Sequence, residues 1–423
     1  MVDADNKSEI SRRQFLIKAS VAGAALMSGR SKGESKPDYH LPPDFLSGNE
    51  QFWGYLKDYI SSARQNIISY KNGEKVIIPS PAYASGIYGR DAFFSILGLA
   101  DGQLSLNCYR QFERDQNPKS GQIPTQVLFN PGNETEKWCD DETTMLFLIW
   151  SGVVKEWGGN INQEKIEKSL EFVQQHVQDS LYYSDPGDFK YWADTLINPQ
   201  KQVITYNQGL YCCALQTMFE NNWGKVTFEE VEKAKEGYRA IWRQNREKGY
   251  LPQAQRQDLI DLSALFPEVL SRYLFNEPIL SDQMASSTVD YFLAKALVTG
   301  KETGKLYGFK IICSGNGAFL SPKAISVSAF SEPGDYQNGG YWPMWTLVDL
   351  ALAFKIAPKE KKEGYRQIIL ELLGEELDKD GEAKEYIRLC PDPVVLGSSE
   401  EMRHKYSWNV FFIPIARWAG LNR

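Results

Sequence analysis

The sequence predicts an all-α protein that folds as an (α/α)6 barrel, a ring of six helical hairpins in which inner helices are enclosed by outer ones. Three observations predict this fold. Hydrophobic periodicity and turn residues mark about twelve helical segments and little convincing strand. Strongly charged segments alternate with segments that carry almost no charge, and the alternation occurs about six times. Each repeat of the alternation would supply one hairpin.

The charged segments are the expected outer helices, because their polar faces must meet water. Segments 162–180 and 228–248 are the clearest, with acidic and basic residues spread over several turns. Segment 358–380 is similar, and segments 48–71 and 281–301 show the same pattern more weakly.

The segments with little charge are the expected inner helices, because a helix that is apolar all round must be buried. Segments 145–154 and 206–219 contain no charged residue. The other expected inner helices are 87–99, 259–275, 342–354 and 406–420. Segment 259–275 fits the pattern least well, since it contains Asp261, Glu268 and Arg272.

The chain from residue 48 onward is expected to form one domain. No Pro-rich or Gly/Ser-rich linker interrupts it, so residues 48–423 are predicted to be a single barrel. A solenoid of helical hairpins would require a sequence repeat, and the sequence shows none. Segment 314–335, rich in Gly, Ser and Pro, is expected to be a long loop on the face of the barrel that holds the site.

The N-terminus has the pattern of an export signal. Arg12 and Arg13 precede Phe15, Leu16 and a short run of small apolar residues, which is typical of a twin-arginine signal. We expect residues 1–30 to be this signal and 31–47 a linker, with the twin-arginine translocase as export partner and a periplasmic or extracellular mature protein. The apolar run is too short to span a bilayer, so no stable membrane insertion is expected once the signal is removed. A short amphipathic helix is the alternative interpretation.

Composition excludes several classes of function. A net charge of −7 without a basic stripe argues against a nucleic-acid partner. The 6 cysteines are scattered, without the spacing of a metal site, so no metal or other cofactor is expected. The 11 Trp, 22 Tyr and 21 Phe provide many rings, and aromatic rings can stack on the apolar faces of sugars. Carbohydrate is therefore a permitted ligand.

A polar or aromatic cluster precedes each expected inner helix. Any one cluster could simply cap its helix. In a ring of parallel inner helices, however, all the N-termini gather at one end, so the clusters would share one cavity. The clusters are 89–91, 140–142, 194 with 206–208, 261–263, 338–343 and 405–408. Their carboxylates, arginine, amides and rings together are typical of a saccharide site. Cleavage of a glycosidic bond needs two carboxyl groups, and these clusters contain candidates for both.

Five motifs, in order along the chain, resemble those of the six-hairpin glycosidases. They are 88–94, 121–124, 140–147, 192–194 with 206–211, and 337–343. The resemblance covers roughly residues 83–418 and is strongest to the α-1,6-glucosidase domain of glycogen-debranching enzymes and to the neutral/alkaline invertases. It implies an inverting, exo-acting glycoside hydrolase for an α-glucoside or related oligosaccharide. Ala92 departs from the family pattern, which usually has Thr or Trp there.

The resemblance also implies roles for individual residues. Asp141 matches the proton donor, with Asp140 as the alternative, and Glu385 matches the general base, with Glu332 as its rival. The expected substrate-binding residues are Arg90, Asp91, Trp138, Asp194, Asn207, Asn338, Trp342 and Trp408. The helix dipole would favour an ionised Asp141, but burial and the neighbouring acidic residues would oppose it. We therefore expect a bell-shaped pH dependence on the acid side of neutral.

Three other functions fit the same fold. A polysaccharide lyase would use a Tyr or His to abstract a proton beside a uronate, and it would favour a basic pocket. A sugar epimerase would use two histidines, whereas only His404 stands near an expected inner helix start. A barrel that binds carbohydrate without turnover is the third, and it would be insensitive to Asp141→Asn.

Overall fold

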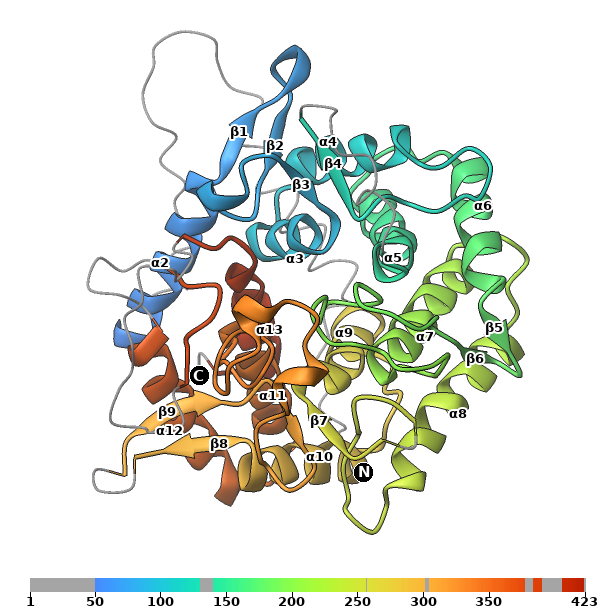
Figure 1. Cartoon of the computed structure of the whole chain (residues 1–423). Coiled ribbons are helices and arrows are strands. Elements are labelled where there is room, and N and C mark those ends of the chain that lie inside the picture. Colours follow the sequence, from blue (N-terminus) through green and yellow to red (C-terminus); the bar gives the residue numbers. More distant parts are fainter. Residues whose placement is uncertain are drawn as a thin grey trace, which may run out of the picture.

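The computed structural model describes residues 50–129, 140–255, 257–300, 304–376, 383–389 and 405–421. These residues form twelve α-helices, α2 to α13, arranged as six hairpins (Figure 1), so the predicted (α/α)6 barrel is confirmed. The predicted signal (1–30), the linker (31–47), Trp138 and His404 lie outside the described residues. In the described part of the chain, no helix is both long enough and apolar enough to cross a membrane.

Six helices form a closed inner ring. They are α3 (Gly89–Leu99), α5 (Glu142–Glu156), α7 (Thr205–Glu220), α9 (Phe266–Phe275), α11 (Pro343–Ile356) and α13 (Phe412–Ala419). Each contacts the next around the ring, and α13 contacts α3. Their apolar side chains form one continuous buried core, which is why these sequences carry so little charge.

The outer helices each precede an inner one in the chain and lie at the periphery in Figure 1. They are α2 (Glu50–Gln65), α4 (Gly102–Arg114), α6 (Gln163–Gln174), α8 (Phe228–Gln244), α10 (Asp282–Lys295) and α12 (Lys359–Glu376). Helix α4 is not identified by the charge pattern, because its only charged residues lie near its end. Its start is nevertheless well defined, since the side chain of Asp101 accepts a hydrogen bond from the Leu104 N–H at 2.9 Å.

The fourth inner helix begins later than the sequence predicts. Residues Leu259–Asp261 form strand β7, and a 3-10 turn, Leu262–Leu265, precedes α9. The Asp261 side chain accepts a hydrogen bond from the Ser263 N–H at 2.9 Å, which fixes the turn. Asp261 therefore stands at the end of a strand and not within a helix. The last inner helix also starts with a 3-10 turn, Trp408–Phe411.

Short antiparallel strand pairs connect the helices. They are β1 (Ile67–Ser69) with β2 (Lys75–Ile77), β3 (Gly86–Tyr88) with β4 (Gln126–Leu128), β5 (Val177–Gln178) with β6 (Leu181–Tyr182), β7 with β10 (Ile312–Ser314), and β8 (Leu297–Thr299) with β9 (Leu306–Phe309). Strand β3 leads directly into α3, so its pairing with β4 fixes where α3 begins.

An irregular hairpin spans residues 184–202, between β6 and α7. Isolated bridges join Ser184 to Gln202 and Gly187 to Asn198, so Asp194 lies near the tip. A further bridge joins Leu196 to Ile325 in the long loop predicted over 314–335. The hairpin is thereby held on both sides, and we refer to it as the 184–202 hairpin.

Candidate active site

Arg90 and Glu142 form the centre of the site. Arg90 lies in the first turn of α3 and Glu142 is the first residue of α5, and the Nη1 atom of Arg90 lies 3.4 Å from Oε1 of Glu142. The Tyr206 hydroxyl, from the first turn of α7, donates to the same Oε1 at 3.3 Å. Burial raises the pKa of Glu142 to about 8, although Arg90 opposes the shift. Three neighbouring inner helices therefore converge on one buried carboxyl.

Glu142 was not among the residues predicted from sequence. The acidic triplet at 140–142 pointed to this place, but the interpretation favoured its first two members. The structure gives the three side chains different surroundings, because consecutive residues at a helix start point about 100° apart. Glu142 is the member that contacts Arg90.

Asp140 lies directly before Asp141, the N-cap residue of α5, and its side chain binds the first turn of the helix. Its Oδ1 accepts a hydrogen bond from the Thr143 N–H at 2.9 Å, and its Oδ2 accepts from the Thr143 hydroxyl at 3.2 Å. Both carboxylate oxygens are thus occupied in the way expected of an N-cap. This arrangement gives Asp140 a structural role at the helix start.

Asp141 is buried and faces the α6 side of the barrel. Burial raises the pKa of Asp141 to about 6. Among the neighbouring groups His176 acts most strongly and lowers the pKa. Asp140 raises the pKa, and Lys190 and a hydrogen bond from Tyr182 lower it. His176 follows α6, and Tyr182 ends β6. The groups that act most strongly on Asp141 are therefore not those that surround Arg90.

Asp194 projects from the 184–202 hairpin toward Arg90. Burial raises its pKa to about 6, and Arg90 and a hydrogen bond from Gln337 oppose the shift. The Gln337 Nε2 atom donates to Asp194 Oδ1 at 2.9 Å, while Gln337 Oε1 accepts from the Thr195 N–H at 2.8 Å. Asp194 is only partly buried, whereas Asp91, Glu142 and Glu385 are buried. It is the acidic side chain of this group that a ligand can reach from outside.

Glu385 lies opposite, in segment 383–389. This segment is held by the pair of hydrogen bonds between Tyr341 and Ile387, at 2.8 and 2.7 Å. The Tyr83 hydroxyl lies 3.1 and 3.2 Å from the two carboxylate oxygens of Glu385. Burial raises the pKa of Glu385 well above its usual value, with Asp91 and Asp194 adding to the shift and a Tyr406 hydrogen bond opposing it. Asp91 and Asp194 thus lie close enough to Glu385 to disfavour its ionisation.

Asp91 stands between these groups. Burial raises its pKa, while Arg90 and a hydrogen bond from Tyr406 lower it. Among the described residues, its buried Oδ1 atom has no hydrogen-bond partner. Asp91 therefore retains an acceptor at the centre of the cluster. We call Arg90, Asp91, Glu142, Asp194 and Glu385 the central cluster.

Two of the three predicted tryptophans, Trp342 and Trp408, form a buried aromatic support. The guanidinium of Arg90 lies 5.5 Å from the Trp408 ring centroid, within the range of a cation–π interaction. The Trp342 ring packs against Trp408 at 5.7 Å and stacks on Tyr386 at 5.6 Å. Both tryptophans are almost fully buried. Trp408 therefore holds Arg90 in place, and Trp342 holds Tyr386, the residue after Glu385.

The two predicted asparagines position loops. Asn338 Oδ1 accepts from the Leu320 N–H at 2.9 Å, and its Nδ2 donates to the Ser331 carbonyl at 2.7 Å. Asn207 Nδ2 donates to the Lys190 carbonyl at 3.0 Å. The side-chain amide groups of both residues thus form hydrogen bonds with the backbone of neighbouring loops. Glu332, the rival for the general base, is exposed in the same long loop.

The central cluster combines one cation with four carboxyl groups. Such a set can bind sugar hydroxyls and can hold one carboxyl protonated beside another that is ionised. Within the described residues, no group of three or more His, Cys, Asp or Glu side chains is arranged to hold a metal ion.

Comparison with known proteins identifies the fold. No family model and no curated protein sequence matches the chain. Among solved structures, it is similar to a glycosidase with a TM-score of 0.58 and 14% identity, over 87% of this chain and 98% of the other. A GH63 mannosylglycerate hydrolase from Thermus thermophilus gives a TM-score of 0.50 and 12% identity, over 86% of this chain and 100% of the other.

A bacterial glucoamylase in complex with acarbose is also similar, with a TM-score of 0.54 and 12% identity over 88% of this chain and 55% of the glucoamylase. At these identities the likeness shows the fold. The chain shares its (α/α)6-barrel fold with these glycosidases.

Proposed function

We propose that this chain, with its six-hairpin glycosidase fold, is an inverting, exo-acting glycoside hydrolase for an α-glucoside or related oligosaccharide. The observation that carries the proposal is the central cluster: the Asp194 carboxyl raises the pKa of Glu385 across a site that contains Arg90, which lowers the pKa of both. Two carboxyl groups that share one site hold a single proton over part of the pH range. Inverting hydrolysis requires that state, with one acid and one base.

Asp194 is the proton donor in this proposal. A pKa of about 6 keeps a substantial fraction of Asp194 protonated in mildly acidic solution. Its partial exposure allows a glycosidic oxygen to approach, and the hydrogen bond from Gln337 to Oδ1 fixes the orientation of the carboxyl group.

Glu385 is the general base. In its ionised form it accepts a hydrogen bond from Tyr83 and one from Tyr406, and both stabilise the carboxylate. Burial, Asp91 and Asp194 raise its pKa, which favours the proton on Glu385. The productive state, with the proton on Asp194 and Glu385 ionised, is therefore the minor one of the two singly protonated states of the pair. An inverting pair should lie about 6.5 to 9.5 Å apart, with a water beside the base.

Arg90 and Asp91 bind the sugar in the innermost position. Arg90 offers guanidinium donors held by Glu142 and Trp408, and Asp91 offers its unpaired Oδ1 as an acceptor. Glu142 acts through Arg90, which it holds in position. Asp141, the donor predicted from sequence, stays an alternative for the acid, and Asp140 is less favoured because its side chain binds the first turn of α5.

Hydrolysis of defined substrates tests the proposal. The purified protein would be incubated with α- and β-linked disaccharides of glucose, and the anomer first released would be followed by proton NMR. Because one similar structure is a mannosylglycerate hydrolase, mannosylglycerate belongs in the panel. Release of the inverted anomer supports the proposal. Retention contradicts the mechanism, and binding without release from any substrate favours a non-catalytic carbohydrate-binding barrel.

We also propose that the twin-arginine signal exports the protein to the periplasm or beyond, with the twin-arginine translocase as partner. The proposal rests on Arg12 and Arg13 and the apolar run after them. Replacing both arginines with lysine should retain the protein in the cytoplasmic fraction. An unchanged distribution would contradict export by this route.

A further inference from the structure

We infer that a groove along the 184–202 hairpin binds the leaving-group sugars of an oligosaccharide substrate, so that the enzyme prefers chains longer than a disaccharide. The inference rests on the proposed function, because it assigns a ligand to the side of the site that carries Asp194. Four observations support it: the position of the groove, its lining, an unpaired buried acceptor, and its continuation across the surface.

The hairpin that carries Asp194 forms one wall of the groove. The groove has a volume of about 300 Å³, and Leu196 and Ile197 line it directly after Asp194 and Thr195 in the chain. Lys323 lies on the opposite side, in the long loop. A proton donor must contact the glycosidic oxygen, so the leaving group lies on the donor's side of the scissile bond. The groove is on the hairpin that supplies the donor.

The lining has the mixed chemistry that a sugar requires. Apolar side chains such as Leu196 and Ile197 can cover the faces of a sugar ring, and the amides of Gln253 and Gln257 can bind its hydroxyls. Ile197 is 40% exposed, although large apolar side chains in the described residues are otherwise almost all covered.

Gln253 provides an unpaired acceptor. It is 2% exposed, and its Nε2 donates to the Tyr191 hydroxyl at 3.1 Å. Its Oε1 atom is buried and has no hydrogen-bond partner among the described residues. Buried polar atoms are normally paired, so this carbonyl is suited to accept a hydrogen bond from a ligand hydroxyl. Tyr191 also lines the groove, and its hydrogen bond with Gln253 fixes the orientation of the Gln253 amide.

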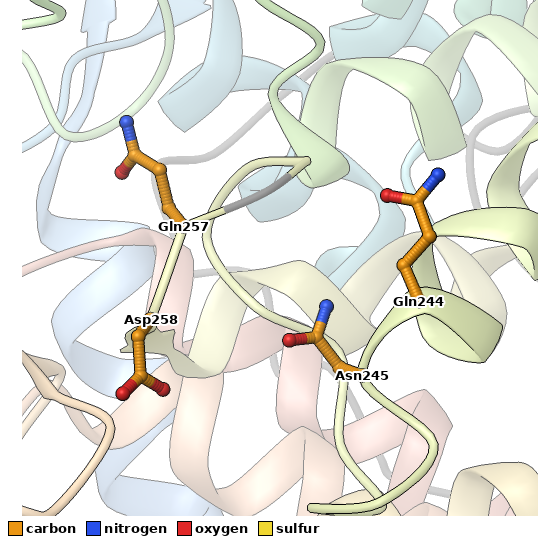
Figure 2. Close-up of a pocket in the computed structure, with 4 residues that line it drawn as sticks. All are labelled: Gln244, Asn245, Gln257 and Asp258. Carbon is orange, nitrogen blue, oxygen red and sulfur yellow. The ribbon is translucent and has the colours of Figure 1, made fainter.

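The groove continues into a second hollow. Gln257 lines both, and the second hollow, of about 450 Å³, is also lined by Gln244, Asn245 and Asp258. In Figure 2 the amides of Gln244 and Gln257 extend in the same direction, with Asn245 between them, while Asp258 points the opposite way. Two adjoining hollows lined by amides provide room for more than one sugar unit. This continuity favours a chain over a single small ligand.

The test compares chain lengths in binding and in turnover. Binding would be measured by calorimetry with Asp194→Asn, which removes the proton donor, and with glucose and gluco-oligosaccharides of two to five units in α-1,4, α-1,6 and β-1,4 linkage. We expect affinity to rise about tenfold from the disaccharide to the tetrasaccharide of the preferred linkage. Adding Ile197→Ala and Gln257→Ala should remove this rise and leave the affinity for glucose unchanged, because a single sugar occupies only the innermost position; unchanged glucose binding also shows that the variant is folded. Phe228→Ala, at an exposed phenylalanine on α8, is the matched control and should keep the rise.

The outcomes separate this inference from the proposed function. Hydrolysis and binding that do not depend on chain length, or a rise that survives in the groove variant, overturn the groove and leave the hydrolase standing. Binding that increases with chain length in a protein without hydrolytic activity supports the groove and overturns the hydrolase. Failure of every chain to bind overturns the groove.

Discussion

The Arg90 guanidinium lies 3.4 Å from the Glu142 carboxyl, although the two residues are 52 positions apart and belong to different inner helices. This contact exists because the ring brings the starts of α3 and α5 together. The same convergence buries several carboxyl groups around one cation, and burial raises the pKa of each of them. The central cluster is therefore suited to hold protons in mildly acidic solution.

The first prediction concerns stability and pH. Because the folded-state pKa of Glu142 is about 8 and its usual value is 4.5, the folded protein keeps a proton that the unfolded chain releases between these values. The resulting stabilisation is complete below pH about 4 and is lost as the pH rises through about 8. Asp141, Asp194 and Asp261, with pKa values of about 6, act in the same direction. We expect the free energy of unfolding in urea to fall by about 2 to 4 kcal/mol from pH 5 to pH 8.

Glu142→Gln should flatten this pH dependence, because glutamine cannot release the proton. Glu164→Gln, at an exposed position on α6, is the control and should leave the slope unchanged. A slope that is the same in Glu142→Gln and in the natural protein would show that Glu142 titrates as it does in the unfolded chain.

The second prediction is a bell-shaped pH dependence of kcat/KM. Activity requires a protonated Asp194 and an ionised Glu385, and the pair provides that state over a limited range of pH, in which it holds one proton. The alkaline limb should follow the loss of this last proton from the pair. Initial rates at constant ionic strength between pH 4 and pH 9 provide the measurement, and a flat profile would argue against acid–base catalysis by this pair.

The third prediction concerns Tyr83, whose hydroxyl contacts both carboxyl oxygens of Glu385. Removing this donor in Tyr83→Phe destabilises the ionised form, so the pKa of Glu385 rises further. We expect kcat/KM at pH 5 to fall about tenfold, because a smaller fraction of Glu385 is ionised there. Tyr307→Phe on β9 is the control. An unchanged kcat/KM at pH 5 would mean that another group is the base.

The fourth prediction separates the acid from the base. Fluoride leaves without protonation, so hydrolysis of a glycosyl fluoride depends on the base much more than on the acid. Asp194→Asn should retain about a tenth or more of the natural rate on α-glucosyl fluoride, whereas Glu385→Gln should lose at least about a hundredfold. Fluoride release, followed with an ion-selective electrode, measures both. Equal losses in the two variants would contradict the assigned roles.

The barrel could be predicted from the sequence because it depends on the burial of whole helices. Segments 145–154 and 206–219 contain no charge, and such helices can only be internal. Helix α4 could not be recognised in this way, since most of its length carries no charge. The strand Leu259–Asp261 was also missed, because it is defined by pairing with a strand about fifty residues later.

The site was predicted in outline and differs in detail. The sequence places Arg90, Asp91, Asp194 and Glu385 at helix starts or in loops near them, and the structure brings them together. It could not show which member of the 140–142 triplet contacts Arg90, because that depends on the rotation of α5 within the ring. The sequence also could not show that the Asn338 side chain binds the backbone of the long loop, because its partner, Leu320, is 18 positions away in the chain.

The most direct test of the assigned proton donor is the comparison of Asp194→Asn with Asp141→Asn, each assayed for kcat/KM on the best disaccharide substrate. Both residues have a pKa near 6, so protonation alone does not distinguish them. We expect a loss of at least about a thousandfold for Asp194→Asn and less than about tenfold for Asp141→Asn. The reverse order would contradict the assignment and would identify Asp141 as the proton donor.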